Sequence, residues 1–380
     1  MLVSKPFNPP QHQTLVHLSS PTMKLHLLIP SLFWPGDSLP EIYRDLPLPA
    51  LETLLAKSLR TEEESQGVEA WLCRAFDVAK QQDWPVAPLT LQADSAGQVT
   101  AEDHYWLRAD PVHLRLEHNQ IMLADSQIFR ITLEEANQLT DLLNQHFAAD
   151  GCDLPSQHAA AAQQKLVFLP LTPDRWYLRV AETPALQTHA LSAAAGRNIN
   201  ALLPSGTDNM RWQGYFNEVQ MLLYEHPLNQ AREARGELAI NGIWLWGGGT
   251  MPQSLNCPYT QVWSNAALLR SLALACATEH AELPSTATAW CQSATAGNHL
   301  AILDMLQEKT QYDNAYGWRE SLKKLEQDWF VPLLAALKQG KLDQLTLTII
   351  SEHGDKNFTI TRDDLWKFWR TAKPLATYAV

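Results

Sequence analysis

The run Lys24-Leu-His-Leu-Leu-Ile29 is the stretch from which the fold can be worked out. It is short and apolar, and Pro30 ends it, which is the pattern of a buried strand. Two further apolar runs, Gly242–Trp246 and Leu345–Ile350, have the same character, and helical patterns separate the three runs. Strands that alternate with helices predict an α/β core with one mostly parallel sheet. We expect all three runs to lie in that sheet, with helices on its faces.

Helical patterns surround these strands. After Pro49, leucines at positions 51, 54, 55 and 59 lie on one face of a predicted helix over residues 50–59, and a second helix is predicted over residues 62–82. Towards the C-terminus, the sequence predicts helices near residues 209–224, 265–278, 299–308, 319–338 and 363–370.

The middle of the chain has a different pattern. Strands are predicted at residues 104–107, 113–116, 121–124, 165–169 and 175–180, and the capping box Thr132-Leu-Glu-Glu135 opens one helix among them. We therefore expect residues 100–199 to form a smaller α+β lobe inserted into an α/β core made of residues 23–99 and 200–380. An alanine-rich linker is predicted over residues 150–164 and a flexible leader over residues 1–22, with Met1 and Met23 both open as the native start.

Composition excludes several classes of protein. The 380 residues are 46% hydrophobic and carry a net charge of −12, which fits a globular protein and disfavours a surface that coats nucleic acid. No apolar run reaches the ~18 residues that a membrane span needs. The five cysteines form no CxxC pair, and the first 22 residues contain no apolar signal-peptide core, so we expect a cytoplasmic protein. The sequence leaves the oligomeric state open.

Two neighbouring segments are candidates for binding an anion. Gly247, Gly248 and Gly249 follow a predicted strand, and glycines allow backbone N–H groups to approach a phosphate. Just before that strand, Arg232 and Arg235 could bind a phosphate or carboxylate with two hydrogen bonds each. The alternatives are a tight strand-to-loop turn for the glycines and a solvated turn, with Glu233 paired to the arginines, for the basic segment.

The end of the last predicted strand is a candidate metal site. Glu352, His353 and Asp355 follow this strand, at the edge where open α/β sheets bind ligands. Carboxylate and imidazole groups suit hard or borderline metal ions. The alternative is a polar turn that holds a hydrogen-bonded histidine.

Three blocks together resemble the archaeal-type cofactor-independent phosphoglycerate mutases of the alkaline phosphatase superfamily. They are HPLNQAREARGELAINGIWLWGGGTMP (226–252), LPALETLLAKS (48–58) and LTLTIISEHGDKN (345–357). The WLRADPVHLR, NEVQMLLYEHPLN and RWYLR blocks further resemble a bacterial offshoot of that family, the RpfE-type regulatory proteins. The resemblance implies an alkaline-phosphatase-like sheet with an inserted lobe. It also implies a phospho-ligand side of the cleft that includes His226, Asn229, Arg232, Arg235 and Asn241.

The chain departs from that family where chemistry is expected. The resemblance implies two divalent ions held by Asp and His, and a serine nucleophile. Pro30 stands where a metal-binding Asp is expected, while Asn314 and Trp318 replace an Asp and a His. Glu352 and His353, helped by Asp313, would remain as a remnant site for at most one weakly bound Mn, Zn or Co ion.

The resemblance and these departures leave three functions open. The first is a degenerate mutase-like protein that binds a phosphorylated small molecule or a protein partner in a regulatory role. The second is an active, metal-dependent phosphoglycerate mutase or related phosphoryl-transfer enzyme. The third is a purely structural interaction protein with tryptophan-rich surfaces. Neither nucleic acid nor a membrane is expected as a partner.

Overall fold

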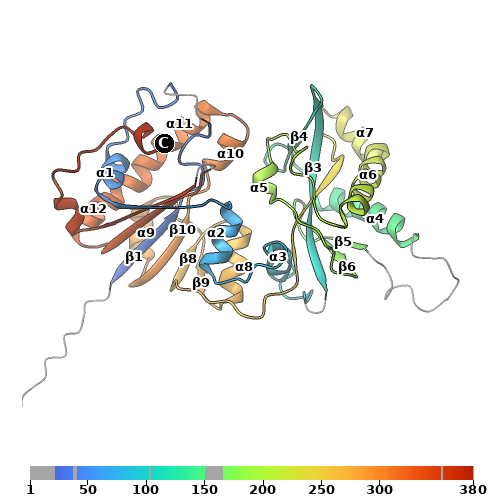
Figure 1. The fold of residues 1–380 in the computed structure, drawn as a ribbon, viewed down its shortest axis with the longest axis horizontal. Coiled ribbons are helices and arrows are strands. Elements are labelled where there is room, and N and C mark those ends of the chain that lie inside the picture. The colour runs from blue at the N-terminus through green and yellow to red at the C-terminus, as the bar shows by residue number, and fades with distance from the viewer. Residues whose placement is uncertain (1–21, 37–40, 102–103, 150–165, 352–353, 380) are drawn as a thin grey trace, which may run out of the picture.

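A computed structural model describes residues 22–36, 41–101, 104–149, 166–351 and 354–379. The chain folds around two sheets that lie side by side, each with its own helices (Figure 1). We call the sheet near the chain ends, with its helices, the core lobe, and the other sheet, with its helices, the second lobe. The predicted mixed α/β fold, with a mostly parallel sheet flanked by helices, is confirmed.

The core lobe is built on a seven-stranded sheet. In spatial order its strands are β2 (Leu59–Glu63), β12 (Asp355–Thr361), β11 (Gln344–Ile349), β1 (Met23–Leu28), β10 (Gly297–Ile302), β8 (Gln261–Trp263) and β9 (Glu279–Ala281). The strands from β11 to β9 are parallel, whereas β12 and β2 are antiparallel to their neighbours. The predicted first and last strands therefore share one sheet, and β1 pairs directly with β11.

Helices cover both faces of this sheet, so apolar side chains of its central strands are buried on each side. One face packs against α1 (Pro49–Lys57), α9 (Ala287–Ser293), α11 (Ala315–Leu325), a π-helical turn (Glu326–Phe330) and α12 (Val331–Gln339). The other face packs against α2 (Val68–Ala75) and α8 (Ala267–Ala275). The remaining elements of this lobe are α3 (Val86–Asp94), α10 (Gln307–Gln311), a 3-10 turn (Asp363–Trp366) and α13 (Ala376–Ala379).

The second lobe is an antiparallel sheet organised by one long strand. This strand, β3 (Tyr105–Glu117), pairs with β4 (Gln120–Ala124), β6 (Trp176–Val180) and β7 (Gly242–Gly249), and β5 (Leu166–Pro170) pairs with β6. On its outer side lie α4 (Leu133–Ala149), α6 (Asn209–Glu225) and α7 (Pro227–Ala234), while α3 packs between this sheet and the core lobe (Figure 1). The short helix α5 (Leu191–Ala194) also lies between the sheets.

Several predicted elements are wrong. The run Gly242–Trp246 does not join the parallel sheet, because it forms β7 of the second sheet. Residues 299–308 were expected to be helical, but β10 ends at Ile302 and pairs with β1. The helix predicted over residues 62–82 is replaced by strand β2, a loop and the shorter helix α2. Two predicted strands at residues 104–107 and 113–116 are a single strand, β3.

The second lobe draws on more of the chain than the predicted insertion of residues 100–199. Its sheet begins at Tyr105 and is completed by β7, which ends at Gly249. Trp106 and Gly249 are paired neighbours, so the chain enters and leaves the second lobe at adjacent points. The predicted leader and linker lie mostly or wholly outside the residues that the structure describes.

Candidate functional site

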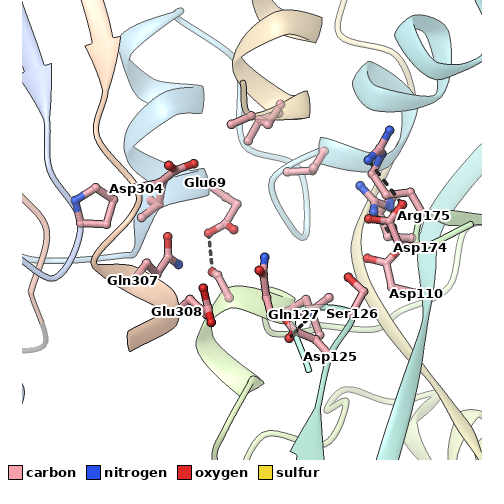
Figure 2. Close-up of a pocket in the computed structure, with 18 of the residues that line it drawn as sticks. Glu69, Asp110, Asp125, Ser126, Gln127, Asp174, Arg175, Asp304, Gln307 and Glu308 are labelled. Carbon is pink, nitrogen blue, oxygen red and sulfur yellow. Dashed lines mark hydrogen bonds and ion pairs between the residues drawn. The ribbon is translucent and has the colours of Figure 1, made fainter. Parts of the chain in front are cut away.

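A cavity of about 490 Å³ lies between the two lobes, and both contribute to its walls. The core lobe supplies residues that follow its strands, including Pro30 after β1 and Asp304 after β10. The second lobe supplies Arg108 and Asp110 of β3 and Trp246 of β7. Figure 2 shows the acidic side chains on opposite walls of this inter-lobe cavity. Such a position, at the carboxyl ends of parallel strands, is where α/β proteins commonly bind ligands.

A buried ion pair forms part of the wall from the second lobe. The Arg108 side chain donates from Nε and Nη2 to one oxygen of Asp110, at 3.0 and 2.7 Å. The other Asp110 oxygen accepts a 2.7 Å hydrogen bond from the Trp246 indole. Arg108 also lies 5.2 Å from the ring centres of both Tyr177 and Trp246. The position of this guanidinium group is therefore fixed by the fold before any ligand arrives.

The second arginine of the cavity is also held by acidic groups. Arg175 binds both oxygens of Asp94, at 2.7 and 3.0 Å, and lies 3.6 Å from Asp174. Burial favours the neutral form of Asp94, but hydrogen bonds from Arg175 and Tyr177 outweigh it and hold the pKa of this carboxyl below its usual range. Both guanidinium groups of the cavity wall thus have carboxylate partners.

Three other carboxyl groups face the cavity with no basic side chain within salt-bridge distance among the described residues. Glu69 accepts a 2.9 Å hydrogen bond from the Ser192 hydroxyl, and Asp125 accepts one of 2.6 Å from Tyr312. Burial raises the pKa of Glu69 and that of Asp125, although these hydrogen bonds oppose the shift. Asp304 is the third such group.

The cavity is consequently acidic. Its described lining contains six carboxyl groups (Glu69, Asp110, Asp125, Asp174, Asp304 and Glu308) and two guanidinium groups (Arg108 and Arg175). A phosphoglycerate carries both a phosphate and a carboxylate, so this lining would repel it unless cations entered with it. The cavity offers hydrogen-bond acceptors more readily than it offers donors.

The arginines expected to bind an anion lie in the second lobe, outside the lining of this cavity. Arg232 is 1% exposed and donates to both Glu135 oxygens at 3.0 Å. It also donates to the backbone carbonyls of Leu238 and Arg130, at 2.8 and 2.7 Å. Arg235 is more exposed and binds Glu237 and Glu135. Both arginines thus bind acidic side chains of the same lobe.

The polar residues beside these arginines also bond within the lobe. His226 caps α7 by accepting a hydrogen bond from the backbone of Leu228. Asn229 is buried and exchanges two hydrogen bonds with the backbone of Ile240, and Asn241 does the same with Leu114. These contacts join α7, β3 and the segment that leads into β7.

The three glycines lie inside β7 and are buried. A methyl group on Gly248 would lie 2.4 Å from the Tyr105 hydroxyl oxygen, and one on Gly249 would lie 2.6 Å from Pro85. Gly247 has a φ of +64°, a conformation that favours glycine. Close packing against β3 and α3 therefore accounts for these glycines, and protein atoms fill the space on the side where their side chains would lie.

The positions implied for metal ligands are occupied by residues that build the core lobe. Pro30 is buried and has no donor atom on its side chain, and Asn314 uses its side-chain oxygen to cap α11. Trp318 is fully buried and donates from its indole nitrogen to the carbonyl oxygen of Ser31 at 2.9 Å. Asp313 has a φ of +52° and is exposed, while Glu352 and His353 lie outside the described residues.

No alternative metal centre is evident among the residues with described side chains, where no three His, Cys, Asp or Glu side chains come together as ligands. Two serines that follow β1 and α1, Ser31 and Ser58, also make internal contacts. Ser31 has a φ of +58° and accepts a 2.9 Å hydrogen bond from Thr310, whereas Ser58 donates to the carbonyl oxygen of Leu54 at 2.6 Å. No described helix is long and apolar enough to cross a membrane.

Sequence reasoning identified Pro30 but missed the charged residues that line the inter-lobe cavity. Arg108 and Asp110 stand within a largely apolar strand, and this alternation of charged and apolar residues was the available signal for a buried ion pair. Asp304 was not recognised as a residue at the carboxyl end of a strand, because the sequence before it predicts a helix. Glu69 has no sequence signal of its own, since only the fold brings α2 beside the second lobe.

Comparisons with known proteins give a distant relationship. No protein-family profile matches the chain. Over 168 residues, or 43% of this chain, it is 27% identical to 2,3-bisphosphoglycerate-independent phosphoglycerate mutase of Methanosarcina barkeri, and the match spans 37% of that protein. A solved cofactor-independent phosphoglycerate mutase from Thermoplasma acidophilum aligns with a TM-score of 0.47 and 12% identity over 94% of both chains. The PH0037 protein from Pyrococcus horikoshii gives 0.47 and 11% over 90% of this chain and 87% of its own. The chain is thus distantly similar to cofactor-independent phosphoglycerate mutases.

Proposed function

We propose that this chain is a mutase-like protein that does not interconvert phosphoglycerates and instead binds a small ligand or a protein partner in a regulatory role. One observation carries the proposal, namely what the residues at the implied metal positions do in the fold. The Pro30 side chain offers no ligand atom, and the indole nitrogen of Trp318 is a hydrogen-bond donor that already binds Ser31. The only candidate oxygen among these three residues, that of Asn314, caps a helix.

Two-metal phosphoryl transfer fails without these donors. The reaction needs two ions ~4 Å apart, so that one can activate the nucleophile while the other stabilises the leaving oxygen. Glu352 and His353, with or without Asp313, would supply too few strong ligands for a pair of ions. We propose that they hold at most one weakly bound Mn, Zn or Co ion.

The inter-lobe cavity is the proposed ligand site. It collects polar groups from both lobes, and its arginines are fixed by their own carboxylates. A phosphorylated small molecule would have to enter with cations because the lining is acidic. The regulatory role is the one that the RpfE-type resemblance implies, and we propose that the protein performs it in the cytoplasm.

The alternative is an active metal-dependent mutase. The sequence similarity to the Methanosarcina barkeri protein favours this alternative, because that protein is a 2,3-bisphosphoglycerate-independent phosphoglycerate mutase. In that case Glu352 and His353 would be essential.

Turnover and metal content separate the two functions. The full chain would be assayed for conversion of 3-phosphoglycerate to 2-phosphoglycerate with Mn, Zn or Co, beside a His353→Ala variant. We expect equal background rates in both proteins and no more than one ion per chain by elemental analysis. Metal-dependent turnover that His353→Ala abolishes would establish the active enzyme and overturn the proposal.

A further inference from the structure

The seven-stranded sheet ends in an edge strand, β2. All five of its residues, Leu59 to Glu63, are exposed. One edge of β2 pairs with β12, and among the described residues no strand pairs with its other edge. Unpaired backbone groups along an exposed edge are a template for a further strand.

The charges along this edge are divided by sign. Arg60 lies near the start of β2, and Glu62, Glu63 and the exposed Glu64 lie at its end. Behind the start of the strand, Lys57 and Arg370 add two more cations, because Arg370 donates to the Ser58 carbonyl at 2.7 Å. The edge therefore has a basic end and an acidic end.

An exposed aromatic patch lies beside the basic end. Trp366, Phe368 and Trp369 are 79%, 84% and 66% exposed. The backbone of this segment is held against α1, since Lys57 donates to the carbonyl oxygen of Lys367 at 2.9 Å. Leu59, itself 62% exposed, follows at the start of β2. Three large exposed aromatic side chains on a segment whose backbone is anchored mark an interaction surface.

We propose that the occupant of this edge is a second copy of the chain, paired through β2 about a two-fold axis at Thr61. Antiparallel pairing centred on Thr61 places Arg60 of each copy opposite Glu62 of the other. The same symmetry places the basic, aromatic end of each edge beside the acidic end of its partner. The edge is thus complementary to itself, which is what an interface between identical chains with two-fold symmetry requires.

Arg60 and Glu62 already contact each other within one chain. In the proposed dimer these two pairs lie on the same face of the joined sheet and form a four-membered network of alternating charge. Cross-strand pairs of opposite charge stabilise antiparallel strands, and like charges directly opposite destabilise them. The proposal does not depend on the ligand or the activity of the inter-lobe cavity.

The test is the mass of the full chain in solution, measured by light scattering over a range of protein concentrations. We expect a mass near twice 42.7 kDa at the higher concentrations. Arg60→Glu and Glu62→Arg should each place like charges across the axis and raise the dimer dissociation constant by at least about tenfold. The double variant Arg60→Glu, Glu62→Arg restores opposite charges and should restore the dimer.

The β3–β4 hairpin offers a matched control, because Arg115 and Glu117 are also an ion pair two residues apart on an exposed strand end. Arg115→Glu should leave the dimer intact. A monomeric wild type, or a dimer that Arg60→Glu does not weaken, would overturn the proposal. Failure of the double variant to re-form the dimer would also overturn it. Binding of the monomer to vesicles containing anionic lipid, lost in Phe368→Ser, would reassign the aromatic patch to a membrane surface and reject the dimer.

Discussion

Replacing Arg232 by Ala should destabilise the second lobe strongly. The side chain is 1% exposed, and its guanidinium group joins Glu135 near the start of α4 to the carbonyls of Leu238 and Arg130. Removing it leaves the largely buried Glu135 carboxylate and both carbonyls without this donor. Breaking a buried charge pair costs roughly 3–5 kcal/mol, and because Glu135 keeps its contacts to Arg235 and Thr132, we expect a loss of about 3 kcal/mol.

This loss of unfolding free energy can be measured as a decrease in melting temperature. A lobe of this size melts about 2–4 °C lower for each kcal/mol lost, so Arg232→Ala should lower the midpoint by on the order of 10 °C. Circular dichroism, with tryptophan fluorescence as a second probe, would follow the transition. The control is Arg235→Ala, which removes an exposed partner of the same Glu135 and should shift the midpoint little. A midpoint for Arg232→Ala within a degree of the wild type would refute this reasoning.

The Arg235→Ala variant also tests the prediction, made from the sequence, that Arg232 and Arg235 bind an anion. If Arg232 and Arg235 grip a phosphate, the exposed Arg235→Ala variant should lose phosphate affinity by at least about tenfold while keeping its stability. Isothermal titration with inorganic phosphate would measure this affinity. Equal phosphate affinity of the wild type and Arg235→Ala would reject the anion site. Arg235 would then serve only its contacts to Glu135 and Glu237.

Two further perturbations follow from local packing. Burial lowers the pKa of His26 from 6.5 to about 4, so the unfolded chain binds this proton more readily than the folded one, and stability from this group is lost as pH falls from 6.5 towards 4. Between pH 7 and pH 5, the melting temperature of the wild type should therefore fall more than that of His26→Gln. Equal falls would contradict the lowered pKa of His26. Gly248→Ala should cost about 1–3 kcal/mol, because the added methyl group would lie 2.4 Å from the Tyr105 hydroxyl. The matched helical variant Gly214→Ala meets nothing within 4 Å and should be neutral or stabilising in the same melting experiment.

The parts of the fold that the sequence predicts best are those with an unambiguous local pattern. Strand β1 is a short apolar run ended by proline, and the capping box of α4 is present, with the Glu135 backbone N–H bonded to Thr132 at 3.2 Å. Strand β10 was missed because a short buried apolar run fits a strand and a buried helix equally well. Strand β7 was assigned to the wrong sheet because helices cover both sides of the second sheet, so its sequence is as apolar as that of a parallel strand.

The candidate site was less predictable than the fold. Glu69, Arg108 and Asp304 come from three distant segments, and only tertiary packing brings them to one cavity. Arg232, by contrast, has a clear sequence signal that indicates the wrong partner. Its position in a conspicuous basic segment indicated a ligand, whereas its actual partner, Glu135, is 97 residues away in the sequence.

The central position of β1 has a consequence for the order in which the protein is assembled during synthesis. Its two neighbours, β10 and β11, are made far later, and the Met23 backbone N–H bonds to Asp343, 320 residues further on. At ordinary rates of translation this separation corresponds to a delay of roughly 15–60 s. The second lobe, which ends at Gly249, is complete before either neighbour emerges. In the nascent chain, the apolar side chains of Leu25, Leu27 and Leu28 therefore stay exposed while the second lobe is already able to fold. Such exposed apolar segments are what chaperones protect from aggregation.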